Sequence, residues 1–342
     1  MELILRYSSI GEKIAPEKYY FLDTPQHFRD QHSEFGYAAF STNREVAIYS
    51  RGDHAWVEHD VSFTANNAGL VQRKDIDPTK SHVVVVGDSF TQGQGASPWF
   101  YELENELQGL PLANLGVIGT GVLHWEKAVD WFQKHVADVD MVVVIFIASD
   151  FSRPYWFAKS SPNELQFCYE FACSTIFTKL LDAAPLDLAQ RRREVSQRQG
   201  PISVGDAHSI GAGFRTQLMK TRTGSMLVAV LRSTRSAPWK HFEANKAGLQ
   251  ALLARHKVAF ALHLPEKGEA AEGKWSATSL EIKGFISTMK LRYVDGLERC
   301  ALNVSDFRSF DPHPNPTGYR KIKECVLVLL KTTQQGSSSQ RP

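Results

Sequence analysis

Two polar stretches of this sequence hold side chains that can do chemistry together. "GDSFTQG" follows an apolar run and carries Ser89, and "DPHPNPTGY", far downstream, carries Asp311 and His313. A serine hydroxyl is a weak nucleophile until a histidine removes its proton and a carboxylate fixes the imidazole tautomer. If the fold brings these three side chains together, they suit nucleophilic acyl transfer.

Other chemistries for the first stretch fail on spacing. A P-loop needs a lysine after its second glycine, and no lysine follows the glycines of "GDSFTQGQG". The dinucleotide fingerprint G-x-G-x-x-G is broken because "GQGASP" ends in proline. The nucleophile elbow of α/β-hydrolases needs a glycine two residues after the serine, where this chain has Thr91.

The elements that must position these residues alternate between strands and helices. "HVVVVG", "PLANLG" and "DMVVVIFIA" are apolar runs typical of buried strands, and the segments between them repeat apolar residues at helical spacing. Further helices are expected over about 239–256, 276–290 and from Pro316, with strands at "VAFALHL" and "RYVDG". This alternation predicts a doubly wound parallel sheet of the α/β class.

Two more polar stretches follow predicted strands of that sheet. "NLGVIGTG" includes Gly119, and "IASDF" includes Ser149. Because ligands of a parallel α/β sheet bind at the carboxyl ends of its strands, we expect these residues to lie near Ser89.

The four stretches together resemble the SGNH (GDSL-type) hydrolase superfamily. "GDSFTQG" is similar to its first block, "NLGVIGTG" to its second and "DPHPNPTGY" to its last. The segment "FTANNAGLVQRKDI" before the serine block, and the spacing of Asp311 and His313, resemble a subgroup of bacterial carbohydrate-modifying SGNH proteins. The resemblance implies a flavodoxin-like, five-stranded parallel sheet, with an N-terminal β-rich extension and an inserted lid-like segment.

The resemblance also implies site roles. Ser89 would be the nucleophile, with Asp311 and His313 completing the triad, and the oxyanion hole would use Ser89, Gly119 and Ser149. Ser149 departs from the family pattern, which has an asparagine there. Losing one oxyanion donor costs on the order of 10²–10³ in rate in a protease, so we expect a weaker or differently tuned oxyanion hole.

The function implied is that of a serine esterase that removes acetyl or other short acyl groups from a carbohydrate or similar hydroxyl-bearing substrate. It would need no cofactor. The alternatives are a non-catalytic carbohydrate-binding relative, an O-acyltransferase that uses the same triad, and a lipid or thioester hydrolase.

The chain is expected to divide into an extension over 1–80, a hydrolase domain over 81–331 and a disordered tail over 332–342. Apolar residues show no clear periodicity over about 151–238, so we expect this insertion to form loops and short helices. Aromatic residues open it at Tyr155 and Trp156, where they could stack on a sugar ring or pack the loop.

Composition limits the partners and the compartment. The formal net charge of +2 and the single short basic cluster from Arg191 do not indicate nucleic-acid binding. No apolar run is long enough for a membrane span, and no signal peptide is visible, so a cytoplasmic location is the default and a periplasmic or secreted one the alternative. The four cysteines are read as buried thiols.

Several polar residues have structural readings. Asp88, Asn114 and Asp150 are expected to be scaffold, and Asn315 to cap the last helix. His54 and His59 would point to opposite faces of a strand, so no metal site is predicted. The sequence does not predict an oligomeric state.

Overall fold

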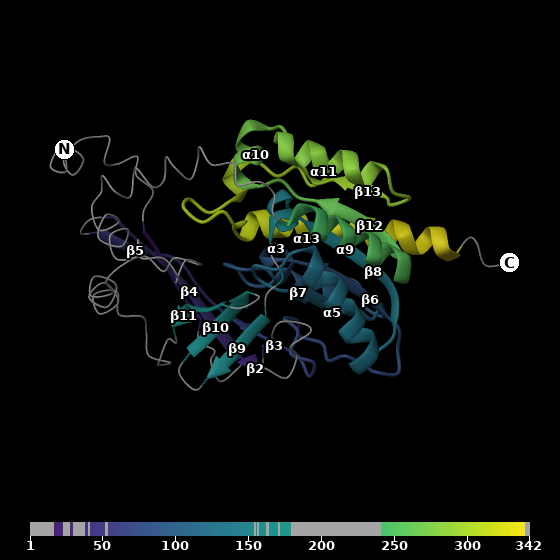
Figure 1. Ribbon diagram of the computed structural model, residues 1–342, viewed down its shortest axis with the longest axis horizontal. Coiled ribbons are helices and arrows are strands. Elements are labelled where there is room, and N and C mark those ends of the chain that lie inside the picture. The colour runs from purple at the N-terminus through teal and green to yellow at the C-terminus, as the bar shows by residue number, and fades with distance from the viewer. Residues whose placement is uncertain are drawn as a thin grey trace.

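The computed structural model, shown in Figure 1, describes the core of the chain and part of its N-terminal half. The described residues are 17–22, 28–29, 38–39, 42–51, 54–153, 155, 157–161, 164–169, 172–178 and 241–338. Trp156, the basic cluster from Arg191 and the glycine-rich "SIGAGF" lie outside them.

A five-stranded parallel sheet forms the centre of the α/β core, in the order β13-β12-β8-β6-β7. Its strands are β6 (His82–Gly87), β7 (Leu112–Gly116), β8 (Val139–Phe146), β12 (Val258–His263) and β13 (Tyr293–Asp295). Because β6 lies between the two core strands that follow it in the chain, this is the flavodoxin-like order. The predicted fold class is confirmed, and the switch point, where such sheets bind ligands, lies between β6 and β8.

The valines of β6 contribute side chains to the hydrophobic clusters on both faces of the sheet. Val83 and Val85 join one hydrophobic cluster, whereas Val84 and Val86 join the other, and all four are almost completely buried. Side chains alternate along a strand, so a strand covered on both faces needs an unbroken apolar sequence.

Helices cover both faces of this sheet (Figure 1). One cluster includes Trp125, Leu249 and Ile282, from α5, α9 and α11. The other includes residues of α4, α10 and α13. The helices are α3 (Ser89–Gln92), α4 (Phe100–Glu106), α5 (Val122–His135), α9 (Phe242–Arg255), α10 (Lys267–Glu272), α11 (Ala277–Ser287), α12 (Gly296–Arg299) and α13 (Pro316–Ser338), with 3-10 turns η2 (Ala148–Ser152) and η3 (Val304–Asp306).

α4 begins at Phe100 after Trp99, which makes no side-chain cap. One boundary, the end of the last helix, differs from the prediction. α13 continues to Ser338, so residues 332–338 belong to the helix and not to the predicted tail. None of the helices in the described part of the chain is long and apolar enough to cross a membrane.

A second sheet combines the N-terminal region with the start of the insertion, in the order β5-β4-β1-β11-β10-β9. Its strands are β1 (Glu17–Leu22), β4 (Thr42–Arg51), β5 (His54–Thr64), β9 (Phe157–Ser161), β10 (Glu164–Tyr169) and β11 (Ala172–Thr178), and a separate pair joins β2 (Phe28–Arg29) to β3 (Ala38–Ala39). β4 and β5 form an antiparallel hairpin. The prediction of loops and short helices is therefore wrong for the described start of the insertion, where three strands pair in antiparallel order.

Cys300 and Cys325 form a disulfide that joins the end of α12 to α13, with their Cα atoms 5.3 Å apart. The prediction of free buried thiols is wrong for this pair. In β10 and β11, Cys168 and Cys173 are at directly opposite register positions. The disulfide closes a loop of the chain that contains both Asp311 and His313.

Candidate active site

Ser89 lies at the carboxyl end of β6, the strand beside the switch point. Asp88 caps the short helix α3 by accepting a hydrogen bond from the Phe90 backbone N–H at 2.9 Å, and Ser89 is the first helical residue. Only glycine fits before this turn, because a Cβ on Gly87 would lie 2.0 Å from Thr91 Oγ1 and 2.5 Å from the Ile145 carbonyl oxygen. The tight turn therefore fixes the direction of the serine.

The structure brings Ser89, His313 and Asp311 together. His313 Nε2 lies 2.8 Å from Ser89 Oγ, although the two residues are 224 positions apart in the chain. The other ring nitrogen, Nδ1, contacts Asp311 Oδ1, which also accepts the His313 backbone N–H at 3.0 Å. The carboxylate thus holds the imidazole at both its ring and its backbone.

The loop that carries Asp311 and His313 is closed by backbone hydrogen bonds. Phe307 and Pro314 form an isolated β-bridge, and the Arg308 N–H donates to the His313 carbonyl at 3.0 Å. Asn315 Oδ1 accepts the backbone N–H groups of Thr317 at 2.9 Å and Gly318 at 3.1 Å, which caps the start of α13 as expected. The imidazole is therefore presented by a fixed loop.

Asp88 gives Ser89 Oγ a second, longer contact. The distance from Ser89 Oγ to Asp88 Oδ2 is 3.3 Å, against 2.8 Å to His313 Nε2. A hydroxyl has one proton to donate. The shorter contact, to the imidazole, is the one that suits proton transfer.

Gly119 and Ser149, the predicted oxyanion residues, lie in the loops that follow β7 and β8. Gly119 is exposed and has a φ of 71°, which side chains disfavour. Ser149 is half-buried in η2, and its backbone N–H donates to Glu266 Oε1 at 3.0 Å. Only the side chain of Ser149 therefore remains as a donor for this role.

Arg153, which the sequence analysis did not single out, joins the ends of three core strands. Its Nη1 lies 2.9 Å from Asp88 Oδ2 after β6, 2.8 Å from the Thr120 carbonyl after β7 and 2.6 Å from Asp150 Oδ1 after β8. Ser89 and Arg153 therefore contact the same carboxylate oxygen. The spacing of Asp150 and Arg153, three residues apart, was a signal for this ion pair.

The electrostatics of this cluster follow from burial. Burial raises the pKa of the fully buried Asp150 well above its usual value, and the Arg153 charge opposes this rise. Burial by itself would lower the pKa of Arg153, but Asp150 and Asp88 raise it. The guanidinium is therefore the fixed positive charge of the cluster, and Asp88 and Asp150 serve as scaffold.

Tyr49 is the other residue that the sequence analysis missed. Its hydroxyl donates to Asp311 Oδ2 at 3.2 Å from strand β4. No local pattern in the sequence indicates this contact, since the two residues are 262 positions apart.

Tyr155 lies in a packing position. Its ring stacks on His124 of α5 at a centroid distance of 4.5 Å, and the Lys127 ammonium lies 5.4 Å from its centroid. This contact favours the loop-packing interpretation over sugar stacking. Trp156, its proposed partner in substrate binding, lies outside the described residues.

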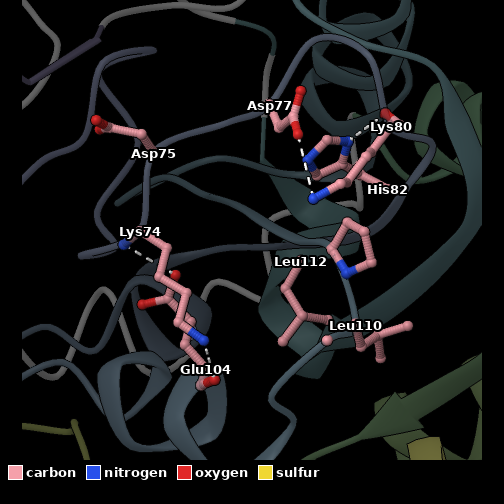
Figure 2. A pocket seen from close by; sticks show the side chains of 10 residues that line it. Lys74, Asp75, Asp77, Lys80, His82, Glu104, Leu110 and Leu112 are labelled. Atoms are coloured by element: carbon pink, nitrogen blue, oxygen red, sulfur yellow. Dashed lines mark hydrogen bonds and ion pairs between the residues drawn. The ribbon is translucent and has the colours of Figure 1, made fainter.

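A pocket (Figure 2) lies at the end of the sheet opposite to Ser89, and its lining includes none of Ser89, Asp311 and His313. It lies beside the first residues of β6 and β7. Its lysines have partners within the protein: Lys80 pairs with Asp77 at 3.2 Å, and Lys74 Nζ donates to the backbone carbonyl of Glu104 at 2.6 Å. No group of three or more metal-ligating side chains occurs among the described residues.

Ser89, His313 and Asp311 are in mutual contact beside the switch point of a doubly wound sheet, in the order of contacts of a serine–histidine–aspartate constellation. No family model and no curated protein matches the chain. Among solved structures, it is similar to a member of the lipolytic protein G-D-S-L family from Veillonella parvula DSM 2008, with 10% sequence identity and a TM-score of 0.33. The match covers 74% of this chain and 99% of that chain.

Proposed function

We propose that the protein is a serine esterase of the SGNH type, which removes acetyl or other short acyl groups from a carbohydrate or similar hydroxyl-bearing substrate. The observation that carries this proposal is the chain of contacts from Ser89 Oγ through both ring nitrogens of His313 to Asp311. All three side chains are buried, at the strand ends where such sheets bind ligands.

The chemistry follows from this chain of contacts. Asp311 accepts the Nδ1 proton of His313, which leaves Nε2 as the base facing the serine. Ser89 Oγ attacks the ester carbonyl while its proton moves to Nε2, and the imidazolium then protonates the departing alcohol. The acyl group remains on Ser89. Water that gives its proton to His313 attacks this acyl-enzyme, and the acid leaves with Ser89 restored.

The negative charge that develops on the carbonyl oxygen needs donors. The backbone N–H groups of Ser89 and Gly119, together with the Ser149 hydroxyl, are assigned this role. A serine hydroxyl reaches less far than the asparagine amide that the family pattern has at this position. We expect Ser149→Asn to raise kcat and Ser149→Ala to lower it.

Transfer to a sugar hydroxyl uses the same first half-reaction. Only the second half differs, since the hydroxyl takes the place of water as the group that attacks the acyl-enzyme. Product analysis after incubation with an acyl donor and a sugar acceptor separates the two: free acid indicates hydrolysis, and a new sugar ester indicates transfer.

A fluorophosphonate probe tests the proposed nucleophile. The probe forms a covalent adduct with an activated serine, and peptide mapping should place that adduct on Ser89. Ser89→Ala should abolish both the labelling and the release of nitrophenol from p-nitrophenyl acetate. Ser287→Ala, which removes a serine hydroxyl on helix α11, is the matched control and should change neither. An adduct elsewhere, or none, would refute the proposal.

A further inference from the structure

The hairpin of β4 and β5 contacts the two loops that carry the proposed triad. These strands precede the five-stranded sheet in the chain and belong to a different sheet, yet β4 bears Tyr49, whose hydroxyl lies 3.2 Å from Asp311 Oδ2. Tyr49 is 4% exposed and Asp311 is fully buried. Water has little access to this contact, so the hydrogen bond has little competition from solvent.

Aromatic packing holds the Tyr49 ring beside this loop. Its centroid lies 6.3 Å from that of Trp56 in β5 and 5.8 Å from that of Phe310, the residue directly before Asp311. Trp56 and Phe310 are in turn 4.9 Å apart. The three rings therefore tie the hairpin to the segment that carries the carboxylate.

Polar contacts join the same surfaces. Glu58 of β5 accepts the Phe310 backbone N–H on Oε1 at 3.1 Å, and its carbonyl accepts Arg308 Nη1 at 2.7 Å. Glu45 of β4 accepts the backbone N–H of Gly95, in the loop after α3. The hairpin is thus bonded to the serine side and to the histidine side of the site.

We propose that Tyr49 is a positioning residue of the active site, which acts through Asp311. Its hydroxyl donates a hydrogen bond to Asp311 Oδ2. This bond holds the carboxylate in the orientation that directs Oδ1 toward His313 Nδ1. The inference rests on the proposed esterase function. It makes the N-terminal hairpin part of the catalytic unit rather than a separate extension.

Tyr49 remains a donor throughout the working pH range. Burial first, and then the negative charge of Asp311, raise its pKa above the ordinary value. Glu58 raises it further. The cations beside these loops are Arg308, whose Nη1 donates to the Glu58 carbonyl, and Lys267, whose Nζ donates to the carbonyls of Arg308 and Ser309. The phenol is therefore protonated at neutral pH and can donate to Asp311.

The test is Tyr49→Phe, which keeps the ring and its packing but removes the hydroxyl. A hydrogen bond to a charged group is worth a factor of about ten or more, so kcat should fall about tenfold. KM should stay unchanged, because Tyr49 touches the carboxylate and not the substrate. Without the phenol, the full charge of Asp311 acts on the imidazolium, so the acid limb of the kcat/KM profile should move to higher pH.

Tyr101→Phe is the matched control. Tyr101 is 5% exposed, and its hydroxyl donates to the Thr64 carbonyl at 2.7 Å, away from the triad. This variant should lower the melting temperature as much as Tyr49→Phe does but leave kcat and the pH profile unaltered. A purely structural role for Tyr49 would make the two variants behave alike.

A double-mutant cycle with Asp311→Asn tests whether Asp311 transmits the effect of Tyr49→Phe on the reaction. This test does not depend on the stability of the variants. If Tyr49 acts through Asp311, adding Tyr49→Phe to Asp311→Asn should not slow fluorophosphonate labelling further. Additive losses, or a Tyr49→Phe enzyme with wild-type kcat and pH profile, would overturn the inference. If the wild-type protein shows no labelling at Ser89, the proposed function fails instead, and the two failures are distinguishable.

Discussion

At the scale of single residues, Arg153 supplies the positive charge that balances the buried carboxylates beside Ser89. Asp88 and Asp150 are buried carboxylates, with side chains 1% and 0% exposed, and the Arg153 Nη1 atom contacts both. The same atom donates to the Thr120 carbonyl, so one cation joins three strand-end loops. The position of Asp88, and hence of the turn that holds Ser89, depends on this guanidinium.

We expect Arg153→Met to destabilise the protein by about 3 kcal/mol, because it leaves two buried carboxylates without their cation. Urea unfolding followed by circular dichroism measures the change. The control is Arg255→Met, whose side chain is 43% exposed and pairs with Asp130 and Glu126, and which should cost less than about 1 kcal/mol. Equal losses in the two variants would contradict the role given to Arg153.

His263 gives the fold a sensitivity to acid. It is fully buried between the rings of Phe146 and Trp275, at centroid distances of 4.5 and 4.2 Å, and its Nδ1 lies 2.9 Å from the Tyr293 hydroxyl. Burial lowers its pKa from 6.5 to about 4. The folded state therefore keeps this histidine neutral at pH values where the unfolded chain has already protonated it.

The sign of the effect follows from the proton balance. Between pH 6.5 and about 4 the unfolded state binds the extra proton, so the stability contributed by neutral His263 is lost as the pH falls through this range. The loss should approach about 3 kcal/mol. His263→Phe should flatten the free energy of unfolding in this window, as measured by urea titrations at several pH values. An unchanged slope would show that other groups dominate.

At the scale of elements, the disulfide between α12 and α13 closes the segment that carries Asp311 and His313. The bond joins residues 25 positions apart, and both Asp311 and His313 lie between them. Closing a loop of this size restricts the unfolded chain and stabilises the fold by about 3 kcal/mol in the chain-entropy account.

We expect the double variant Cys300→Ala/Cys325→Ala to lose about this free energy of unfolding. Its activity well below the melting temperature should stay near that of the wild type, because the loop keeps its own backbone hydrogen bonds. Thermal and urea unfolding, with and without reductant, measure the change. Two freely titrating thiols at these positions in the oxidised wild-type protein would contradict the bond.

At the scale of the whole molecule, the topology explains why much of the core and the proposed triad could be read from the sequence. Buried parallel strands have unbroken apolar runs, and their carboxyl ends meet at one edge of the sheet. Ser89 and Gly119 each follow such a run, so their neighbourhood could be predicted without coordinates. His313 follows no such run, and its prediction depended on the resemblance of "DPHPNPTGY" to the last block of the SGNH superfamily.

Contacts between distant segments could not be predicted in this way. Tyr49 reaches Asp311 only because one sheet docks on another, and Cys300 meets Cys325 only because α13 returns to α12. Neither pairing has a local period or spacing rule. By contrast, "ELQFCY" has apolar residues at alternate positions, which is typical of a strand, and it forms β10. The prediction of loops and short helices for the insertion overlooked this pattern.

The order of the parts along the chain matters while the protein is being synthesised. During synthesis, domains generally fold as units, and those nearer the N-terminus fold first. Ser89 emerges 224 residues before the imidazole that is proposed to activate it. In a nascent polypeptide, the proposed esterase reaction therefore has to wait until His313 has also left the ribosome and folded against Ser89.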